Sequence, residues 1–190
     1  ETALFLDITW PFFCSVDITL VASLLAVALL TVPVFAAENQ SLAVDITKIS
    51  ISNEANNDLL NAATESSPVN GTRITTWDNT GHATQRWDYS ESVPGKPQHY
   101  WLKNSANRSY AVTCYGTDGQ QVTLQSFTRN MTTQPVKFIN EGGSSFNIYG
   151  LANTTYILAL TTTGSYNGAP VLWKGSNNQN NQLWVLGAWG

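Results

Sequence analysis

Few side chains in this sequence can support acid–base or nucleophilic chemistry. The two histidines, His82 and His99, have no Ser or Cys nucleophile with a recognisable partner beside them. Four carboxylates can in principle pair, but the sequence does not place two of them across a bond: Asp58, Glu65, Asp78 and Asp88. No zinc-ligand spacing and no glycine-rich phosphate loop is present. We therefore expect a protein that is not an enzyme and carries no metal or cofactor.

Amide, glycine and aromatic residues instead recur at a nearly fixed interval. Asn70-Gly71, Asp118-Gly119 and Asn167-Gly168 lie 48 and 49 residues apart. The third residue after each glycine is apolar: Ile74, Val122 and Val171. Each unit then leads to a Gln-x-apolar triplet: Gln85-Arg86-Trp87, Gln134-Pro135-Val136 and Gln182-Leu183-Trp184. A period near 48, seen three times, indicates one supersecondary unit repeated around an axis.

Each unit is predicted to contain four short strands, which gives an all-β fold of about twelve strands. The expected strands are 46–52, 59–63, 73–77 and 85–89; then 100–103, 110–115, 121–127 and 136–140; then 146–149, 156–161, 171–174 and 183–186. Turn residues such as Pro94-Gly95 and Gly142-Gly143 separate the units. No long stretch after the N-terminal segment has a helical period.

Three such units, with Gln-x-Trp near the ends of two of them, resemble the ricin-type β-trefoil lectin family. The resemblance covers about residues 44–190, and we assign residues 46–190 to a ricin B-like β-trefoil domain. It implies three lobes around a pseudo-threefold axis, and sugar binding in shallow pockets with up to one pocket per lobe.

The third residue of each triplet is expected in the core, because it lies one position from polar neighbours in a strand. These residues are Trp87, Val136 and Trp184, and we expect Phe138 to fill the space left by Val136. Trp173 shares the inward face of Val171 and is also expected in the core. Cys114 is expected to be a small buried residue.

The resemblance also implies which residues contact sugar: an aromatic residue after the third strand, an acid on the second strand, and an Asn-Gln pair. The aromatic position holds Trp77, which alternation directs outward, and in the other units Gln125 and Lys174. Counting back from each glycine places Ala62, Thr113 and Ala159 at the acidic position. The candidate site residues are Trp77, Asp78, Asn79, Gln85, Thr113, Gln125, Asn181 and Gln182, with Tyr115 and Tyr166 as substitute aromatic platforms.

The charge and cysteine content narrow the class of partner. Only 12 % of residues are charged and the net charge is −4, so no basic field favours nucleic acid. Aromatic residues reach 11 %. Cys14 and Cys114 are the only cysteines, so a disulfide framework is not expected. A polar, weakly charged and aromatic-rich chain favours a secreted module that meets neutral ligands.

The N-terminal segment reads as a leader. Residues 20–36 are strongly apolar, and Val34-Phe35-Ala36 favours cleavage after Ala36. We assign residues 1–36 to a signal peptide or leader helix and residues 37–45 to a linker. The first 47 residues contain no Lys or Arg, which is atypical of a secretory leader, so a membrane anchor remains the alternative.

Two functions from different classes follow. The first is a secreted carbohydrate-binding module that recognises glycans, alone or with a partner toxin or enzyme chain. The second is a trefoil that does not bind sugar and serves as a protein-interaction or assembly subunit of a secreted complex or toxin. Contact with a membrane is expected only through an uncleaved leader.

Overall fold

The computed structural model describes residues 48–152 and 156–189. The predicted leader and linker therefore lie outside the described residues. Within these ranges the structure is all-β, with fourteen strand segments in one hydrogen-bonded sheet and two short 3-10 turns. None of the helices in the described part of the chain is long and apolar enough to cross a membrane.

The strands fall into three consecutive lobes. Lobe one (residues 49–88) contains β1 (Ile49–Asn53), β2 (Leu59–Ala62), β3 (Ile74–Trp77), the turn η1 (Ala83–Gln85) and β4 (Trp87–Asp88). Lobe two (99–142) contains β5 (His99–Trp101), β6 (Lys103–Asn104), β7 (Asn107–Thr113), β8 (Gln120–Gln121), β9 (Thr123–Ser126) and β10 (Pro135–Gly142). Lobe three (145–188) contains β11 (Ser145–Ala152), β12 (Tyr156–Thr162), β13 (Ala169–Gly175), η2 (Asn180–Gln182) and β14 (Leu183–Ala188). Breaks of one residue, at Leu102 and Val122, divide β5 from β6 and β8 from β9.

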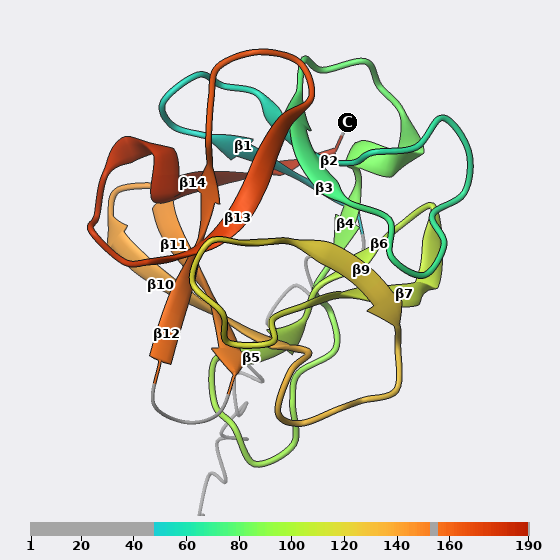
Figure 1. Ribbon diagram of the computed structural model, residues 1–190, viewed down its shortest axis with the longest axis vertical. Helices are drawn as coiled ribbons and strands as arrows, with labels where there is room; N and C mark the ends of the chain where they lie inside the picture. Colours follow the sequence, from blue (N-terminus) through green and yellow to red (C-terminus); the bar gives the residue numbers. More distant parts are fainter. Residues whose placement is uncertain (1–47, 153–155, 190) are drawn as a thin grey trace, which may run out of the picture. The chain divides into compact units, whose positions relative to one another are not determined.

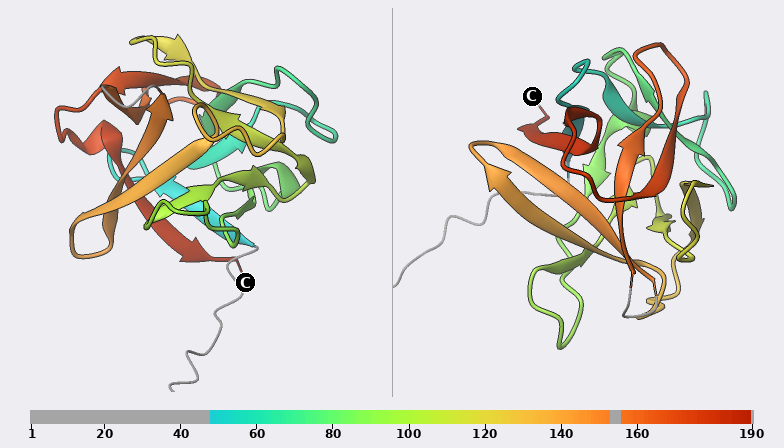
Figure 2. Two further views of the ribbon diagram at one scale, coloured as in Figure 1. Left: turned by 90° about the horizontal axis from the view of Figure 1, so that it is seen from below. Right: turned by 60° about the vertical axis from the view of Figure 1, so that its left-hand side comes forward.

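The first and last strands of the lobes close into a ring. β1 pairs with β4 and β14, β4 with β6, β5 with β10, β10 with β11, and β11 with β14. All of these pairings are antiparallel. The long β10–β11 hairpin, which joins lobe two to lobe three, runs beside β14 (Figure 2). Closure leaves this ring without an open edge.

The two middle strands of each lobe form a hairpin, and the three hairpins pair with one another (Figure 1). β13 contacts both β3 and β8, and an isolated bridge joins Arg73 to Thr123. The apolar residues three positions after the repeat glycines meet here: the Ile74 N–H donates to the Val122 carbonyl, and the Val122 N–H to the Val171 carbonyl. All three side chains are fully buried. This trefoil-like arrangement agrees with the all-β fold predicted from the repeat.

The repeated Asn/Asp-Gly pairs fasten each lobe to the next. Each glycine adopts a positive φ, and its N–H donates to a carbonyl of another lobe: Gly71 to Leu124, Gly119 to Trp173 and Gly168 to Thr76, at 2.7–2.8 Å. The Asn or Asp before each glycine accepts from the backbone two residues beyond that carbonyl: Asn70 from Ser126, Asp118 from Gly175 and Asn167 from Asp78. Lobe one thus holds lobe two, lobe two holds lobe three, and lobe three holds lobe one.

The repeated glutamines complete this frame within each lobe. Their side-chain amides donate to the carbonyls of the same clamped residues: Gln85 to Asp78 (2.7 Å), Gln134 to Ser126 (2.8 Å) and Gln182 to Gly175 (3.0 Å). All three glutamine side chains are buried. A buried amide with its polar atoms satisfied fixes a loop, which explains why these glutamines recur.

The core contains Trp87, Val136 and Trp184 at the ends of the three triplets. The indole N–H groups of Trp87 and Trp184 donate to the carbonyls of Leu60 and Leu160, at 2.9 and 3.0 Å. Each Trp therefore fills its own lobe while its polar atom is satisfied.

Lobe two receives a large side chain that the sequence-based expectation did not assign to it. Phe138 is partly buried against the core that contains Val136, and its ring packs with Tyr89 and Tyr100, with ring centroids 5.1 and 5.9 Å apart. The buried Trp173 of lobe three also enters, and its indole N–H donates to the Thr113 carbonyl at 2.9 Å. Gly150, which pairs with Val136, makes room for it, since a Cβ there would lie 2.9 Å from the indole.

Candidate functional site: an aromatic-walled cavity in lobe one

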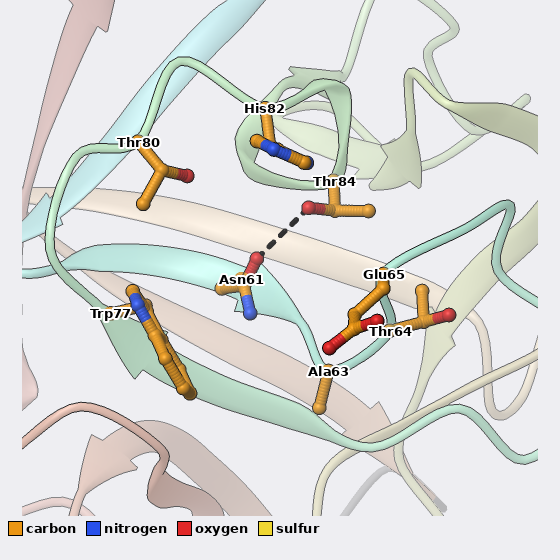
Figure 3. Close-up of a pocket in the computed structure, with 8 residues that line it drawn as sticks. All are labelled: Asn61, Ala63, Thr64, Glu65, Trp77, Thr80, His82 and Thr84. Atoms are coloured by element: carbon orange, nitrogen blue, oxygen red, sulfur yellow. Dashed lines mark hydrogen bonds between the residues drawn. The ribbon is translucent and has the colours of Figure 1, made fainter.

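A cavity of about 390 Å³ opens on the outer face of lobe one. Figure 3 shows the Trp77 indole along one side, and the Glu65 carboxylate directed inward from the opposite side. The remaining lining comes from Asn61, Ala63, Thr64, Thr80, His82 and Thr84. One wall is therefore aromatic, while the others offer amide, hydroxyl, imidazole and carboxylate groups.

Strand alternation places Trp77 on this face. Ile74 and Thr76 point inward and are fully buried, whereas Trp77 ends β3 with 39 % of its surface exposed. Asn61 of β2 lies opposite Thr75 in the hairpin register, and so it shares the outward face of β3. The hairpin alone thus brings an indole and an amide side by side.

The neighbouring lobe supports the indole from behind. A Cβ on Gly168 would lie 3.4 Å from the Trp77 ring, so the glycine at this turn lets the ring approach the backbone closely. Asn167 makes two hydrogen bonds to Asp78, the residue after Trp77. It accepts from the Asp78 N–H at 2.7 Å and donates to the Asp78 carboxylate at 2.8 Å. Lobe three therefore fixes the position of Trp77.

Hydrogen bonds also fix the polar wall. The Thr84 hydroxyl donates to the Asn61 side-chain carbonyl at 3.1 Å, as Figure 3 shows. Gln85 accepts from both the backbone N–H and the hydroxyl of Thr80, at 2.9 and 3.0 Å. Gln85 is itself buried, so its amide shapes the loop that carries Thr80 rather than facing the cavity.

The predicted residues Asp78 and Asn79 do not line this cavity. The Asp78 carboxylate is engaged by Asn167. Burial, and then the negative charge of Asp78, raise the pKa of nearby Asp58. Asn79 accepts from the Gly81 N–H at 3.0 Å and lines a separate hollow with Arg86 and Trp189.

The register corrects one count made from the sequence. In lobe two, Thr113 pairs with Thr123, which lies four residues after the repeat glycine of that lobe. In lobes one and three, the residues that pair with the position four after the repeat glycine are Asn61 and Thr161. The count had given Ala62 and Ala159. Insertions between the second and third strands differ among the lobes, so a count across them drifts. The position assigned to alanine in lobe one therefore holds Asn61, a hydrogen-bonding residue of the cavity.

The aromatic position of lobe two holds Gln125, which is half-buried and donates to Thr123 at 2.9 Å. Thr113 is buried, and its hydroxyl donates to the Ala111 carbonyl at 3.2 Å. In lobe three, Asn181 and Gln182 line a second cavity, with Lys174 at the aromatic position. Tyr115 and Tyr166 are exposed, at 53 % and 61 %.

Sequence reasoning did not select several lining residues: Asn61, Glu65, Thr80, His82 and Thr84. Thr84 occupies the place of Asn181 before the repeated glutamine, and this was a usable signal. Glu65 lies in a loop with no repeated marker, and no neighbouring residue singles it out. In the described residues, no group of three or more His, Cys, Asp or Glu side chains is arranged to hold a metal ion.

Comparison with known sequences gives no relative: neither a protein-family model nor a curated protein matches the chain. The fold has clear structural matches. The designed three-fold symmetric protein ThreeFoil superposes with a TM-score of 0.65 and 17 % identity, over 75 % of this chain and 99 % of its own. The ricin B-like lectin of Macrolepiota procera, solved in complex with lactose, matches with a TM-score of 0.56 and 16 % identity, over 76 % of this chain and 97 % of its own.

The chain has a β-trefoil fold, which it shares with the Macrolepiota procera ricin B-like lectin. The resemblance inferred from the repeats is therefore confirmed at the level of the fold. The same fold matches part of a mosquitocidal holotoxin, with a TM-score of 0.66 and 13 % identity, over 80 % of this chain and 18 % of the toxin. In that protein the matched portion is a small part of a larger molecule.

Proposed function

We propose that this protein is a carbohydrate-binding module that acts by binding rather than by catalysis, and that its lobe-one cavity holds a saccharide ring against Trp77. The observation that carries the proposal is the exposed indole, fixed beside Asn61 and Thr84 at the wall of a 390 Å³ cavity. The apolar face of a sugar ring packs on an aromatic surface, while its hydroxyls need fixed donors and acceptors. The cavity supplies both.

The lactose-bound lectin with the same fold supports this proposal by analogy of fold alone. The Asn61–Thr84 pair offers neutral acceptors and donors, and Glu65 adds one carboxylate acceptor from the facing loop. This set is compatible with a neutral saccharide. It does not select one sugar among several.

The test is an array of immobilised neutral oligosaccharides, probed with the full chain and with Trp77→Ala. Titration calorimetry then measures the affinity for each sugar that binds. We expect saturable binding that Trp77→Ala weakens by about tenfold or more, because the variant loses the apolar contact area of the indole as well as a stacking contribution of about 0.5–1.5 kcal/mol. Met131→Ala, which removes an exposed apolar side chain that does not line the cavity, is the control and should bind as the parent does.

If the full chain binds no oligosaccharide on the array, and both variants are folded, the proposal is contradicted. That result would favour the alternative of a protein-interaction or assembly subunit. Binding that survives Trp77→Ala would place the sugar elsewhere.

Secretion remains part of the proposal and rests on the apolar segment at residues 20–36. N-terminal sequencing of the exported protein tests it, with Ala37 expected as the first residue; retention of residues 1–36 would favour the membrane anchor. A partner toxin or enzyme chain stays a prediction from the resemblance, since the match to the holotoxin concerns the fold.

A further inference from the structure

Lobe three has a cavity of its own, of about 370 Å³, with a chemistry different from that in lobe one. The residues that matter for its chemistry are Thr161, Thr162, Lys174, Asn177 and Asn181. None of its lining residues is aromatic. The nearest indole along the strand, Trp173, points into the core and is fully buried. A sugar ring in this cavity has no aromatic surface on which to stack.

Lys174 occupies the place that Trp77 holds in lobe one. It pairs with Ala159 in the β12–β13 hairpin as Trp77 pairs with Leu59, and it lies six residues after its repeat glycine, as Trp77 does. Its ammonium group lies 3.9 Å from where a Cβ on Gly119 would be, so the turn of the neighbouring lobe supports it as Gly168 supports Trp77. The same backbone position thus carries a charge in one lobe and an indole in another.

The Lys174 ammonium makes no ion pair with the described residues. The ion pairs among those residues belong to Lys103, Arg108 and Arg129. Asp118, the acid on the neighbouring turn, directs its carboxylate to the Gly175 N–H instead. Lys174 is a half-buried residue, and a charge at such a position is attracted to an anion more strongly than one in bulk water, because the local dielectric constant is lower.

Two further polar groups of this cavity are left without partners. Asn181 donates to the Thr162 carbonyl at 3.2 Å, but its side-chain oxygen is buried with no hydrogen-bond donor. Asn177 accepts from the Gln179 N–H at 3.1 Å, and its amide NH₂ makes no hydrogen bond with the described residues. In contrast, the Thr161 and Thr162 hydroxyls donate to the Ala159 and Gly164 carbonyls. Two donors, Lys174 and Asn177, one of them charged, are therefore available to a ligand, whereas the buried Asn181 oxygen is not.

We propose that the lobe-three cavity binds a carboxylate-bearing saccharide of the uronic acid class. Lys174 pairs with the carboxylate, and Asn177 donates to it. This inference deepens the proposed function by adding a second site. It stands on its own residues, none of which lines the lobe-one cavity.

The test is a titration of the ¹⁵N-labelled full chain with sodium glucuronate, glucose and sodium acetate, followed by amide and indole NMR signals. We expect glucuronate to shift the Gly175, Asn177 and Asn181 signals saturably, with an affinity about tenfold or more above those of glucose and acetate. Raising the salt concentration to about 1 M should weaken this binding, since the Debye length falls to about 3 Å.

Lys174→Gln should lose about tenfold or more in glucuronate affinity, whereas Lys174→Arg keeps the charge and should retain most of it. Lys48→Gln removes an exposed lysine and is the control for net charge. Equal affinities for glucuronate and acetate would reduce the site to a general anion pocket and overturn the inference, as would binding unaffected by Lys174→Gln. Neutral sugar binding through Trp77 is measured separately with Trp77→Ala, so either proposal can fail without the other.

Discussion

Lobes one and two have the same hydrogen-bonded frame but differ in what fills it and in what they expose. In lobe one the triplet ends in Trp87, which fills its own lobe, whereas lobe two has Val136 and receives Trp173 from lobe three. On the outside, lobe one exposes Trp77, and lobe two has Gln125 bonded to Thr123. The shared hydrogen bonds therefore fix the backbone of each lobe. The core side chains of the lobes differ in origin but still fill the interior, and the exposed side chains vary from lobe to lobe.

The largest expected effect is on stability, on removal of the Trp173 indole that lobe three contributes to lobe two. Trp173→Ala should lower the free energy of unfolding by about 3–5 kcal/mol, as should Trp87→Ala and Trp184→Ala, because each leaves a large cavity in the core. Urea unfolding of the full chain measures this loss. Val136→Ala should cost much less, and the exposed Trp77→Ala is the control. A cost for Trp173→Ala near that of Trp77→Ala would show that lobe two is not filled from lobe three.

The sequence predicted the frame well because its residues make strict backbone contacts. Asn/Asp-Gly and Gln recur since each fastens a particular N–H or carbonyl, and a substitution leaves a buried group unsatisfied. Alternation in β3 similarly sufficed to direct Trp77 outward. The entry of Trp173 into lobe two was not predicted, and Asn61 was missed by a count across loops of unequal length. Both depend on which strands pair, and this emerges only from the closed fold.

A smaller effect is expected where the indole of Trp173 crosses the backbone of β11. A Cβ on Gly150 would lie 2.5 Å from the Cys114 Cβ and 2.9 Å from the Trp173 ring. Gly150→Ala should therefore cost about 1–3 kcal/mol through overpacking, measured by urea unfolding. Gly175→Ala is the matched control, since its added methyl group meets only the Asp118 carboxylate at 4.0 Å. Equal stability of the two variants would contradict the tight packing of lobe two.

The smallest expected effect concerns an ion cluster between Glu91, in the segment before lobe two, and two basic residues of lobe two, Lys103 and Arg129. A hydrogen bond from Lys103, together with Arg129, lowers the pKa of Glu91 below its ordinary value near 4.5. A lowered folded-state pKa means that Glu91 contributes stability above about pH 4.5, and that this contribution is lost as pH falls through the folded-state pKa. Urea midpoints between pH 7 and pH 3 should therefore fall less steeply for Glu91→Gln than for the parent. Glu54→Gln, at an exposed position, should follow the parent; parallel curves for Glu91→Gln would refute the assignment.

The fastening of each lobe to the next has a consequence for chain connectivity. The hydrogen bonds link the lobes in a cyclic order. No lobe is therefore first or last in the folded molecule, although lobe one is first along the polypeptide. β1 and β14 lie side by side, and the Trp189 N–H donates to the Lys48 carbonyl, which brings the two ends of the described domain together. A short peptide joining these ends, with a new opening between two other lobes, would preserve every inter-lobe hydrogen bond. The hydrogen bonds between the lobes therefore do not depend on where along the chain the termini lie.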